Sequence, residues 1–570
     1  MKFKIIIVFL LCTFFFGCTK DFLDINVDPN NPTSLALNKI LPASQYGMAS
    51  VLGFTNDDRG ARGLTEILAV YTHQITVRDD ADQYGATGST FDIDGAWTGM
   101  FSTASSQASS DFVGALQNLD ALITAAAKDK NLKYLGIGQI LKAYAFSQFV
   151  DVFGDIPYSE ANKFASDGIR YPKFDKSEDI YPQLLTLLDE GIKNLSATGD
   201  GINTLVPGSD DLFYQGSISK WIKAANTIKL KLLCQQRLVK DVKNEVAVLL
   251  NSGNLISSTT EGFMLNYGSS ISPDNRNPGY KDYFTGQKAH YQSPWFYEIL
   301  KGYNPNILTG VTDPRVPYYF YRQISDTGTP GNPTEYRDGG FVSIYFGSNG
   351  KDRDHAADKH MTVLGIYPVG GKYDDDSRKP VDVSSSTGAA PLRLLTYADR
   401  LFIEAELIQA GVVSGDAAAV FNSAVKESLA LVDYVVSKVG SSAPKLYESA
   451  GATAYLAAVK DAFSKGTSEQ RMELIMTEKW ISSFGYSVDQ YTDYRRTGYP
   501  VMWDPRKTNG EVQPPINGNP LFPGAQKKVP VQLSRDYPLS LPWQNDELSV
   551  NPNAPKQKIP STFRVFWDKD

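Results

Sequence analysis

Apolar residues recur with the period of an α-helix over most of the chain, and this pattern constrains the fold more than any other feature. One stretch begins at Ile180 and continues through Leu184, Leu187, Leu188, Ile192 and Leu195. This spacing places the side chains on one face of a helix. Ser177 or Asp179 is positioned to cap that helix, and Pro182 is expected in its first turn, where proline is tolerated. The chain is therefore predicted to be mainly helical.

Two further helices carry start and stop signals. Thr467 and Gln470 have the spacing of a capping box, and Gly485 is placed to end the helix that follows them. Thr396 similarly opens a helix that is expected to end at Gly411. Helical periodicity also marks the segments 95–127, 132–152, 218–239, 416–431 and 452–463.

Two regions lack this period. Residues 263–390 are rich in Gly, Pro, Asn, Asp and Tyr, and they far exceed the roughly 12 to 15 residues of an ordinary unstructured loop. They are expected to form an irregular layer of short strands and loops on the helical scaffold. Residues 499–570 contain 12 prolines, which excludes a long helix and predicts a C-terminal segment laid over the surface.

The first 17 residues have the organisation of a signal peptide. Lys2 and Lys4 precede an apolar run that ends at Phe16, and Gly17 and Cys18 follow. The run is short for a membrane span, which needs roughly 20 residues. A signal that ends in Gly-Cys predicts cleavage before Cys18 and its lipidation, with more than one acyl chain for stable anchoring. The alternative is a secreted protein that is cleaved elsewhere.

Charge and cysteine content limit the partners and the covalent structure. The formal net charge is −7 and becomes more negative when the signal peptide leaves, which argues against nucleic acid as a partner. Cys12 leaves with the signal and Cys18 carries the lipid. Cys234 then has no partner within the chain, so no disulfide is expected.

The mature chain shows no internal boundary. Residues 18–34 are polar and interrupted by proline, as expected of a lipidated tether. Nothing in residues 35–570 marks a linker, so we predict that they form a single domain.

No motif for catalysis or metal binding is evident. Ser217 and Lys220 have the spacing of a Ser-Lys nucleophile pair, but the Ser-Asp-Asn element of that enzyme class is missing. His355 and His360 lie in an acidic stretch, where a solvated charged loop is a simpler interpretation than a metal site. We therefore predict no catalytic residue, no metal and no cofactor. The paired carboxylates of a glycosidase cannot be recognised from one sequence, so a hydrolase stays open.

Aromatic residues make up 12% of the chain, and many lie outside the periodic helices. The densest cluster comprises Tyr280, Tyr283, Phe284, Tyr291, Trp295, Phe296, Tyr297 and Tyr303. Flat rings beside amide and charged groups suit the faces of sugars and also peptide side chains. We predict ligand binding at Trp295, assisted by Tyr291 or Tyr297, and a small second core beneath the loops is the alternative. Arg78 and Tyr84, in another polar connection, are second-rank candidates.

Several short blocks follow one another in a fixed order along the chain. They begin at Asp151, Asp179, Trp221, Asp313, Tyr397, Ile475, Asp493 and Arg564. The most distinctive are Ile475-Met-Thr-Glu-Lys-Trp-Ile-Ser-Ser-Phe-Gly485 and Asp493-Tyr-Arg-Arg-Thr-Gly-Tyr-Pro500. Together they resemble the SusD/RagB family of nutrient-binding outer-membrane lipoproteins of Bacteroidetes, and the resemblance covers nearly the whole chain.

This resemblance implies one domain of tetratricopeptide-like helix pairs that carries an irregular, ligand-facing layer. It also implies a lipoprotein, anchored in the outer membrane through Cys18 and facing the cell surface. Such a protein passes an oligosaccharide or a peptide to a SusC-like TonB-dependent barrel transporter and catalyses nothing. The blocks themselves are expected to hold the scaffold together. A surface glycoside hydrolase and a helical-repeat scaffold that binds only protein are the alternatives.

Overall fold

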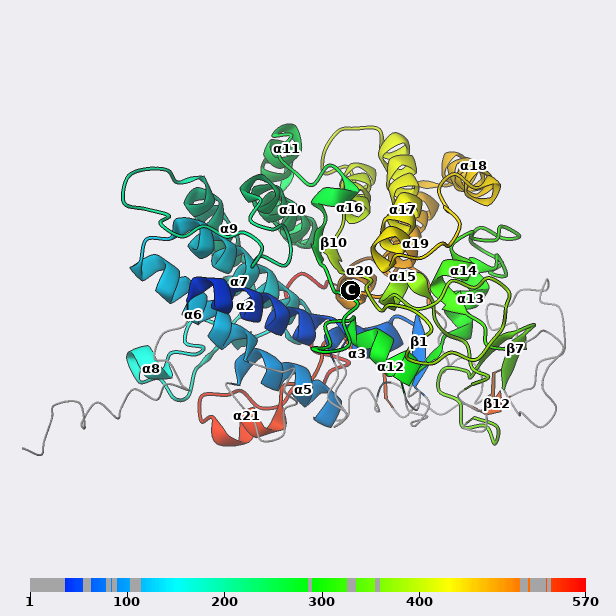
Figure 1. The fold of residues 1–570 in the computed structure, drawn as a ribbon, viewed down its shortest axis with the longest axis horizontal. Helices are drawn as coiled ribbons and strands as arrows, with labels where there is room; N and C mark the ends of the chain where they lie inside the picture. Colours follow the sequence, from blue (N-terminus) through cyan, green and yellow to red (C-terminus); the bar gives the residue numbers. More distant parts are fainter. Residues whose placement is uncertain are drawn as a thin grey trace, which may run out of the picture.

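The computed structural model describes residues 36–54, 63–77, 84, 90–102, 114–285, 290–324, 335–353, 359–502, 511–512, 529–530 and 535–569. Figure 1 shows long helices across the left and top of the molecule and short elements at its right. The longer helices are α2 (Leu37–Leu52), α3 (Leu64–Tyr71), α5 (Thr90–Phe101), α6 (Ala115–Lys128), α7 (Leu132–Phe153), α9 (Ser177–Ser196), α10 (Ile218–Gln236), α11 (Lys243–Asn251), α16 (Tyr397–Gln409), α17 (Ala417–Val439), α18 (Ala450–Lys465), α19 (Ser468–Ser482) and α20 (Val488–Thr497). The predicted mainly helical fold is confirmed.

Helix pairs form the scaffold, and glycines let one of these pairs approach closely. A Cβ atom on Gly136 of α7 would lie 2.6 Å from the carbonyl oxygen of Gly191 on α9. A Cβ atom on Gly191 would lie 2.9 Å from Cγ1 of Ile140. A side chain at either glycine would push α7 and α9 apart. Helices α16 and α17 also pack against each other, as do α2 and α6.

The predicted start signals of two helices are confirmed, and the start of a third is corrected. Thr396 and Thr467 each accept a hydrogen bond from the backbone three residues on, within reciprocal capping boxes. Ser177, in contrast, is the first residue of α9 rather than its cap, so Pro182 lies beyond the first turn. The first turn contains Glu178 and Asp179, whose negative charges interact favourably with the positive N-terminal end of the helix dipole. The segment 95–127 is not one helix, because α5 ends at Phe101 and α6 begins at Ala115.

Short elements make up the described parts of the region 263–390, as predicted. They are β4 (Phe263–Leu265), α12 (Pro278–Thr285), β5 (His290–Gln292), α13 (Pro294–Leu300), α14 (Val316–Tyr319), β6 (Phe320–Tyr321), β7 (Tyr336–Asp338), β8 (Phe341–Ser343), β9 (Val363–Leu364) and α15 (Ile366–Val369). Their strands form antiparallel pairs, such as β6 with β9 and β7 with β8. Two strands pair with the scaffold: β5 with β1 (Ile75–Val77), and β4 with β10 (Leu392–Leu395).

Buried ion pairs hold the scaffold helices together. Glu406 on α16 accepts a hydrogen bond from Arg237 Nε at 2.8 Å and one from Arg496 Nη2 at 2.9 Å. Lys479 Nζ lies 2.7 Å from Asp493 Oδ2. Burial raises the pKa of the Glu406 carboxyl, but the charges of Arg496 and Arg237 outweigh it and hold that pKa well below its usual range. The network therefore joins α10, α16, α19 and α20 through pairs of opposite charge.

A second buried network surrounds Arg315, whose side chain is fully buried. Its Nη2 lies 2.6 Å from Asp313 Oδ2 and 2.8 Å from Glu478 Oε2, and its Nη1 donates to Ser428 Oγ at 3.0 Å. The guanidinium thereby connects the short-element region to α17 and α19. Both networks use residues from the short blocks of the sequence, which agrees with the expectation that these blocks hold the scaffold together.

The C-terminal residues lie across the scaffold. Leu541 N donates to the Val152 carbonyl at 2.9 Å, and Trp543 Nε1 donates to the Asp155 carbonyl at 2.8 Å. The only helix described beyond residue 499 is the short α21 (Asn545–Val550). This segment also contributes to the main core, where Leu541 and Trp567 are fully buried, so it is not simply laid over the surface. Two further strand pairs are described. They are β2 (Ile156–Pro157) with β3 (Phe174–Asp175), and β11 (Glu511–Val512) with β12 (Val529–Pro530). Helix α8 (Phe164–Asp167) is a single turn.

Candidate functional site

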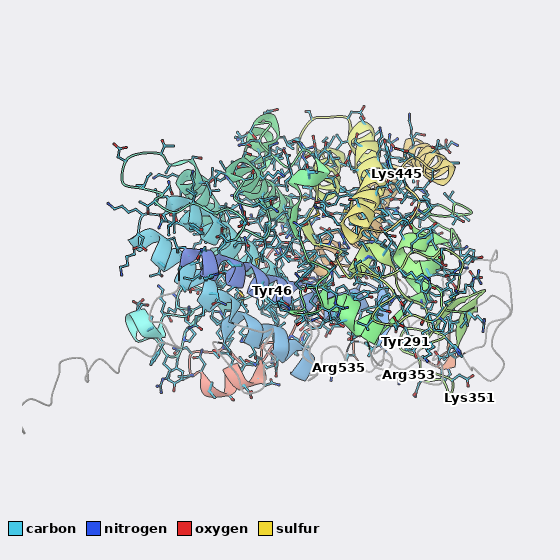
Figure 2. The ribbon with its side chains drawn as sticks, viewed as in Figure 1. Tyr46, Tyr291, Lys351, Arg353, Lys445 and Arg535 are labelled. Carbon is cyan, nitrogen blue, oxygen red and sulfur yellow. The ribbon has the colours of Figure 1, made fainter. Side chains whose placement is uncertain are left out.

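A cavity of about 380 Å³ lies where α3 meets the C-terminal segment. It is lined by Tyr71, Tyr84, Arg535, Asp536, Pro538, Pro542, Ile559, Pro560 and Ser561. We refer to it as the tyrosine cleft. In Figure 2 the labelled Arg535 lies at the lower edge of the molecule. The volume falls within the range of roughly 300 to 1,000 Å³ that is typical of small-molecule sites.

The walls of the tyrosine cleft belong to a cluster of tyrosine rings. The Tyr71 and Tyr84 rings meet edge to face, with centroids 5.7 Å apart and planes at 82°. The Tyr84 and Tyr537 rings meet in the same way at 5.4 Å. Tyr491 and Tyr494 of α20 back this cluster, with ring centroids 6.2 and 5.0 Å from that of Tyr537. Edge-to-face packing fixes each ring in orientation, so the aromatic part of the wall is preformed.

Exposed charges stand at the rim of this aromatic surface. Arg535 and Asp536 are exposed, whereas Tyr84 keeps 7% of its surface accessible. Burial, together with the neighbouring phenols, raises the pKa of Tyr537 well above its ordinary value, so the ring stays neutral. The cleft therefore combines neutral tyrosine, proline and isoleucine side chains in its wall with hydrogen-bonding groups at its mouth, a combination that suits a sugar or a peptide side chain.

The packing of the C-terminal segment fixes the position of this rim. Arg495 Nη1 donates to the Leu539 carbonyl at 2.7 Å, and Tyr491 Oη donates to the Pro538 carbonyl at 2.6 Å. The Arg495 guanidinium also stacks on the Tyr491 ring, 3.9 Å from its centroid. Helix α20 thus holds residues 538–539, and through them the adjoining Arg535 and Asp536.

The predicted ligand residues of the short-element region lie in packed interiors. Trp295 on α13 and Tyr297 each keep 5% exposure and belong to the main core, and Tyr291 on β5 is fully buried in a small separate core. The Tyr297 ring stacks on Phe341 at 3.8 Å, and its hydroxyl donates to Asp338 at 2.7 Å. The structure thus has the packing of the alternative interpretation, and a ligand role for these three residues stays a prediction. Tyr71 and Tyr84 are as buried, at 1% and 7% exposure, and belong to the same main core, so their position at a cavity rather than their exposure distinguishes them.

The second-rank candidates have different outcomes. Tyr84 lines the tyrosine cleft. Arg78 lies outside the described residues. The same is true of residues 1–34, which include the predicted lipidation site Cys18. The sequence did not single out Tyr71, Arg535 or Asp536. These residues come from segments far apart in the chain, and no spacing rule connects them.

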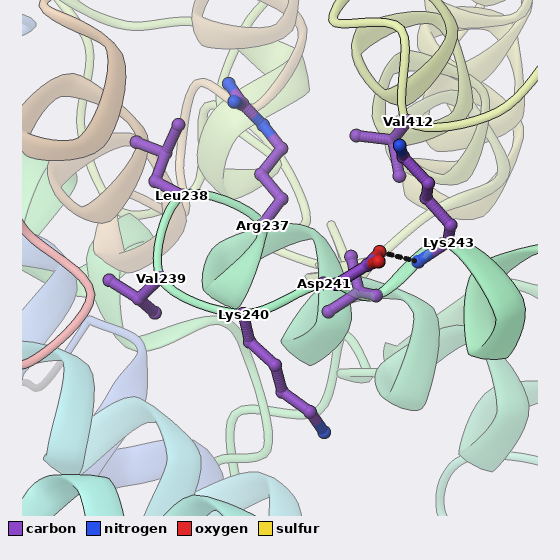
Figure 3. Close-up of a pocket in the computed structure, with 8 residues that line it drawn as sticks. Arg237, Leu238, Val239, Lys240, Asp241, Lys243 and Val412 are labelled. Carbon is purple, nitrogen blue, oxygen red and sulfur yellow. Dashed lines mark hydrogen bonds between the residues drawn. The ribbon is translucent and has the colours of Figure 1, made fainter.

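Two other cavities fit a ligand less well. One, of about 370 Å³, surrounds the loop between α10 and α11, where Lys243 N donates to Asp241 Oδ1 at 3.2 Å (Figure 3). Aliphatic and charged side chains line it without an aromatic ring, and its Arg237 is already bound to Glu406. The other, of about 300 Å³, includes Tyr267 and Lys438. Neither cavity offers the paired rings of the tyrosine cleft.

Side chains with possible catalytic or metal-binding chemistry lie outside these cavities. Lys220 Nζ of the Ser217–Lys220 pair donates to the Thr260 carbonyl at 2.9 Å. His355 lies outside the described residues.

A group of possible metal ligands comes together from α3, α12 and β5. The ligand atoms of Glu66, Asp282 and His290 lie within 4.8 Å of one another. Sequence reasoning missed this group because its members do not form a local motif. In the described part of the chain, no helix has the length and apolar character needed to cross a membrane.

Comparison with known proteins gives consistent results. The sequence profile of the SusD-like family described as "Starch-binding associating with outer membrane" matches residues 61–517. No curated protein sequence matches the chain. Among solved structures, a SusD homologue of Bacteroides fragilis is similar over 94% of this chain and 100% of its own, at 17% identity and a TM-score of 0.63. A Bacteroidetes AC2a SusD-like protein has the same coverage, with 19% identity and a TM-score of 0.65. A chitin-binding protein also covers 94% and 100%, with 20% identity and a TM-score of 0.62.

Proposed function

Because the chain belongs to the SusD-like family of starch-binding, outer-membrane-associated proteins, we propose that it captures an oligosaccharide at the cell surface and catalyses nothing. We further propose that the tyrosine cleft holds the ligand. The observation that carries this proposal is the edge-to-face pair of Tyr71 and Tyr84 beneath the exposed Arg535 and Asp536. Sugars present apolar C–H faces and a rim of hydroxyl groups, which match these two features.

We favour a glycan over a peptide as the ligand because of the descriptions of related proteins, not because of the cleft itself. One structural relative is described as a chitin-binding protein, and the family description names starch. Both are polymers of pyranose rings, whose faces stack on aromatic side chains. The volume of the tyrosine cleft suits a short part of such a polymer.

The delivery step of the proposal rests on the family resemblance. Lipid on Cys18 would anchor the protein in the outer membrane, and a SusC-like TonB-dependent barrel would receive the ligand. Replacing Cys18 by Ala should leave the domain folded but release it from membranes. Membrane fractionation in a strain that lacks the barrel would test this. A Cys18→Ala protein that remains in the outer membrane there would contradict the anchor.

Glycan binding and the absence of catalysis can be tested together. Calorimetric titration of the full chain with maltooligosaccharides and chitooligosaccharides should give saturable binding to at least one series. Chromatography of the same mixtures after long incubation should recover the glycan uncleaved. Cleavage of the bound glycan would favour a glycoside hydrolase. Copurification with a barrel, without binding of any glycan or peptide, would favour a scaffold that binds only protein.

A further inference from the structure

Three side chains from separate elements converge at the junction between the scaffold and the short-element region. Glu66 lies on α3, Asp282 on α12 and His290 on β5, and one ligand atom from each lies within 4.8 Å of the other two. Glu66 and His290 are each 1% exposed, whereas Asp282 is partly exposed. The group is thus buried on one side and accessible on the other.

One pair within this group has the spacing of metal ligands. His290 Nδ1 and Glu66 Oε1 are 3.5 Å apart. Two ligands that each bind a tetrahedral metal at about 2.0 to 2.1 Å are separated by roughly 3.3 to 3.4 Å. The observed separation therefore needs little adjustment for both atoms to bind one ion.

The backbone around Glu66 and His290 belongs to regular elements. His290 pairs with Val77 across the β1–β5 ladder, and Ser293 N donates to the Gln74 carbonyl at 3.2 Å. Glu66 lies within α3, whose last turn leads into β1. Ligands on rigid elements lose little entropy when a metal binds, and this favours binding.

The ligand types narrow the choice of ion. One imidazole and two carboxylates form a mixed nitrogen and oxygen set, which suits zinc and similar divalent transition metals. Calcium and magnesium prefer sites made of oxygen alone. Two carboxylates with a neutral imidazole carry two negative charges, which one divalent cation would neutralise.

We propose that Glu66, Asp282 and His290 form a binding site for a divalent transition metal, with zinc as the representative ion. Bound metal clamps α3 to α12 and β5, and so joins the N-terminal part of the scaffold to the region that contains Trp295. The role is structural, and the metal ligands themselves are not part of the tyrosine cleft, although α3 carries both Glu66 and Tyr71.

The test uses the full-length protein in detergent, treated with chelator and then dialysed against zinc. Elemental analysis should find about one zinc per chain, and zinc should raise the Tm of the treated protein. Cobalt should give the visible absorption of a mixed nitrogen and oxygen site. Asp282→Asn, at the partly exposed ligand, is the variant with the smallest risk to folding, and it should weaken zinc binding at least about tenfold. His290→Gln should do the same.

His360→Gln is the matched control, because His360 lies outside the group and should leave zinc binding unchanged. The proposal is overturned if the folded wild-type protein binds no stoichiometric zinc and shows no change in Tm. It is also overturned if folded Asp282→Asn and His290→Gln proteins bind zinc as the wild type does. Equal or tighter binding of calcium would contradict a transition-metal site.

Discussion

Helix α20 presents two unlike faces to two unlike regions of the molecule. One face carries Asp489, Asp493 and Arg496, which follow one another at intervals of about one turn. All three belong to the buried ion pairs: Arg496 pairs with Asp493, and Lys231 Nζ lies 2.8 Å from Asp489 Oδ1. Tyr491 and Tyr494 lie on another face and back the tyrosine cleft. One helix therefore serves both the scaffold and the candidate site.

The ion-pair network and the tyrosine cleft differ in how strongly the stability of each residue depends on its partners. In the ion-pair network, removal of one charge leaves its buried partners with less compensation, so every member depends on the others. In the tyrosine cleft, neutral rings contact one another, so truncating one ring leaves no buried charge without its partner. Stability should therefore depend mainly on the network, and ligand choice mainly on the cleft.

The largest expected effect follows from breaking the ion-pair network. Arg496→Met leaves Glu406 and Asp493 without their shared partner and should lower the free energy of unfolding by as much as about 5 kcal/mol. Urea unfolding would measure this loss. Lys465→Met, in the exposed pair with Asp461, is the control and should change stability by less than about 0.5 kcal/mol. Equal effects of the two variants would mean that burial does not make the ion-pair network more important for stability than an exposed pair.

A somewhat smaller effect is expected at Trp295, which the sequence placed at the ligand site. If Trp295 is a core residue, Trp295→Ala should lower the free energy of unfolding by about 3 kcal/mol, at the lower end for such truncations, and leave ligand affinity unchanged. If Trp295 contacts a sugar, affinity should fall roughly tenfold to a hundredfold. A thermal melt beside a titration of the same variant separates the two roles.

The sequence predicted the scaffold better than the site, for physical reasons. Helix starts such as Thr396 and Thr467 depend on residues three apart, so their signal is local. The short blocks carried charges that pair within the core, such as Glu406 with Arg496. Aromatic residues give no such signal, because rings like Trp295 pack a core as well as they bind a sugar. The tyrosine cleft needs Tyr71 and residues beyond 535, which only the fold brings together.

The smallest expected effect concerns Asp94 of α5, on the side of the molecule where α21 lies (Figure 1). Burial, and then the charge of Asp546 on α21, raise the pKa of Asp94 to about 7. A carboxyl with a raised folded pKa destabilises the protein when ionised, so stability should rise as pH falls from 7 toward 4. Asp94→Asn should remove this contribution.

Denaturant unfolding of wild-type and Asp94→Asn proteins at pH 8 and pH 5 would test the Asp94 prediction. Because the carboxyl is only half buried, the difference should stay below about 1 kcal/mol. The wild type should gain more stability than the variant between pH 8 and pH 5. An identical pH dependence of the two proteins would mean that Asp94 and Asp546 do not interact in this way.

The most direct test of the division between scaffold and site is a calorimetric titration of Tyr84→Ala with a glycan that the wild type binds. Tyr267→Ala, in the cavity of about 300 Å³, is the matched control. Loss of the Tyr84 ring should weaken binding by about 1 to 3 kcal/mol, roughly tenfold to a hundredfold, while Tyr267→Ala binds as the wild type does. A folded Tyr84→Ala protein with wild-type affinity would contradict the assignment of the ligand to the tyrosine cleft.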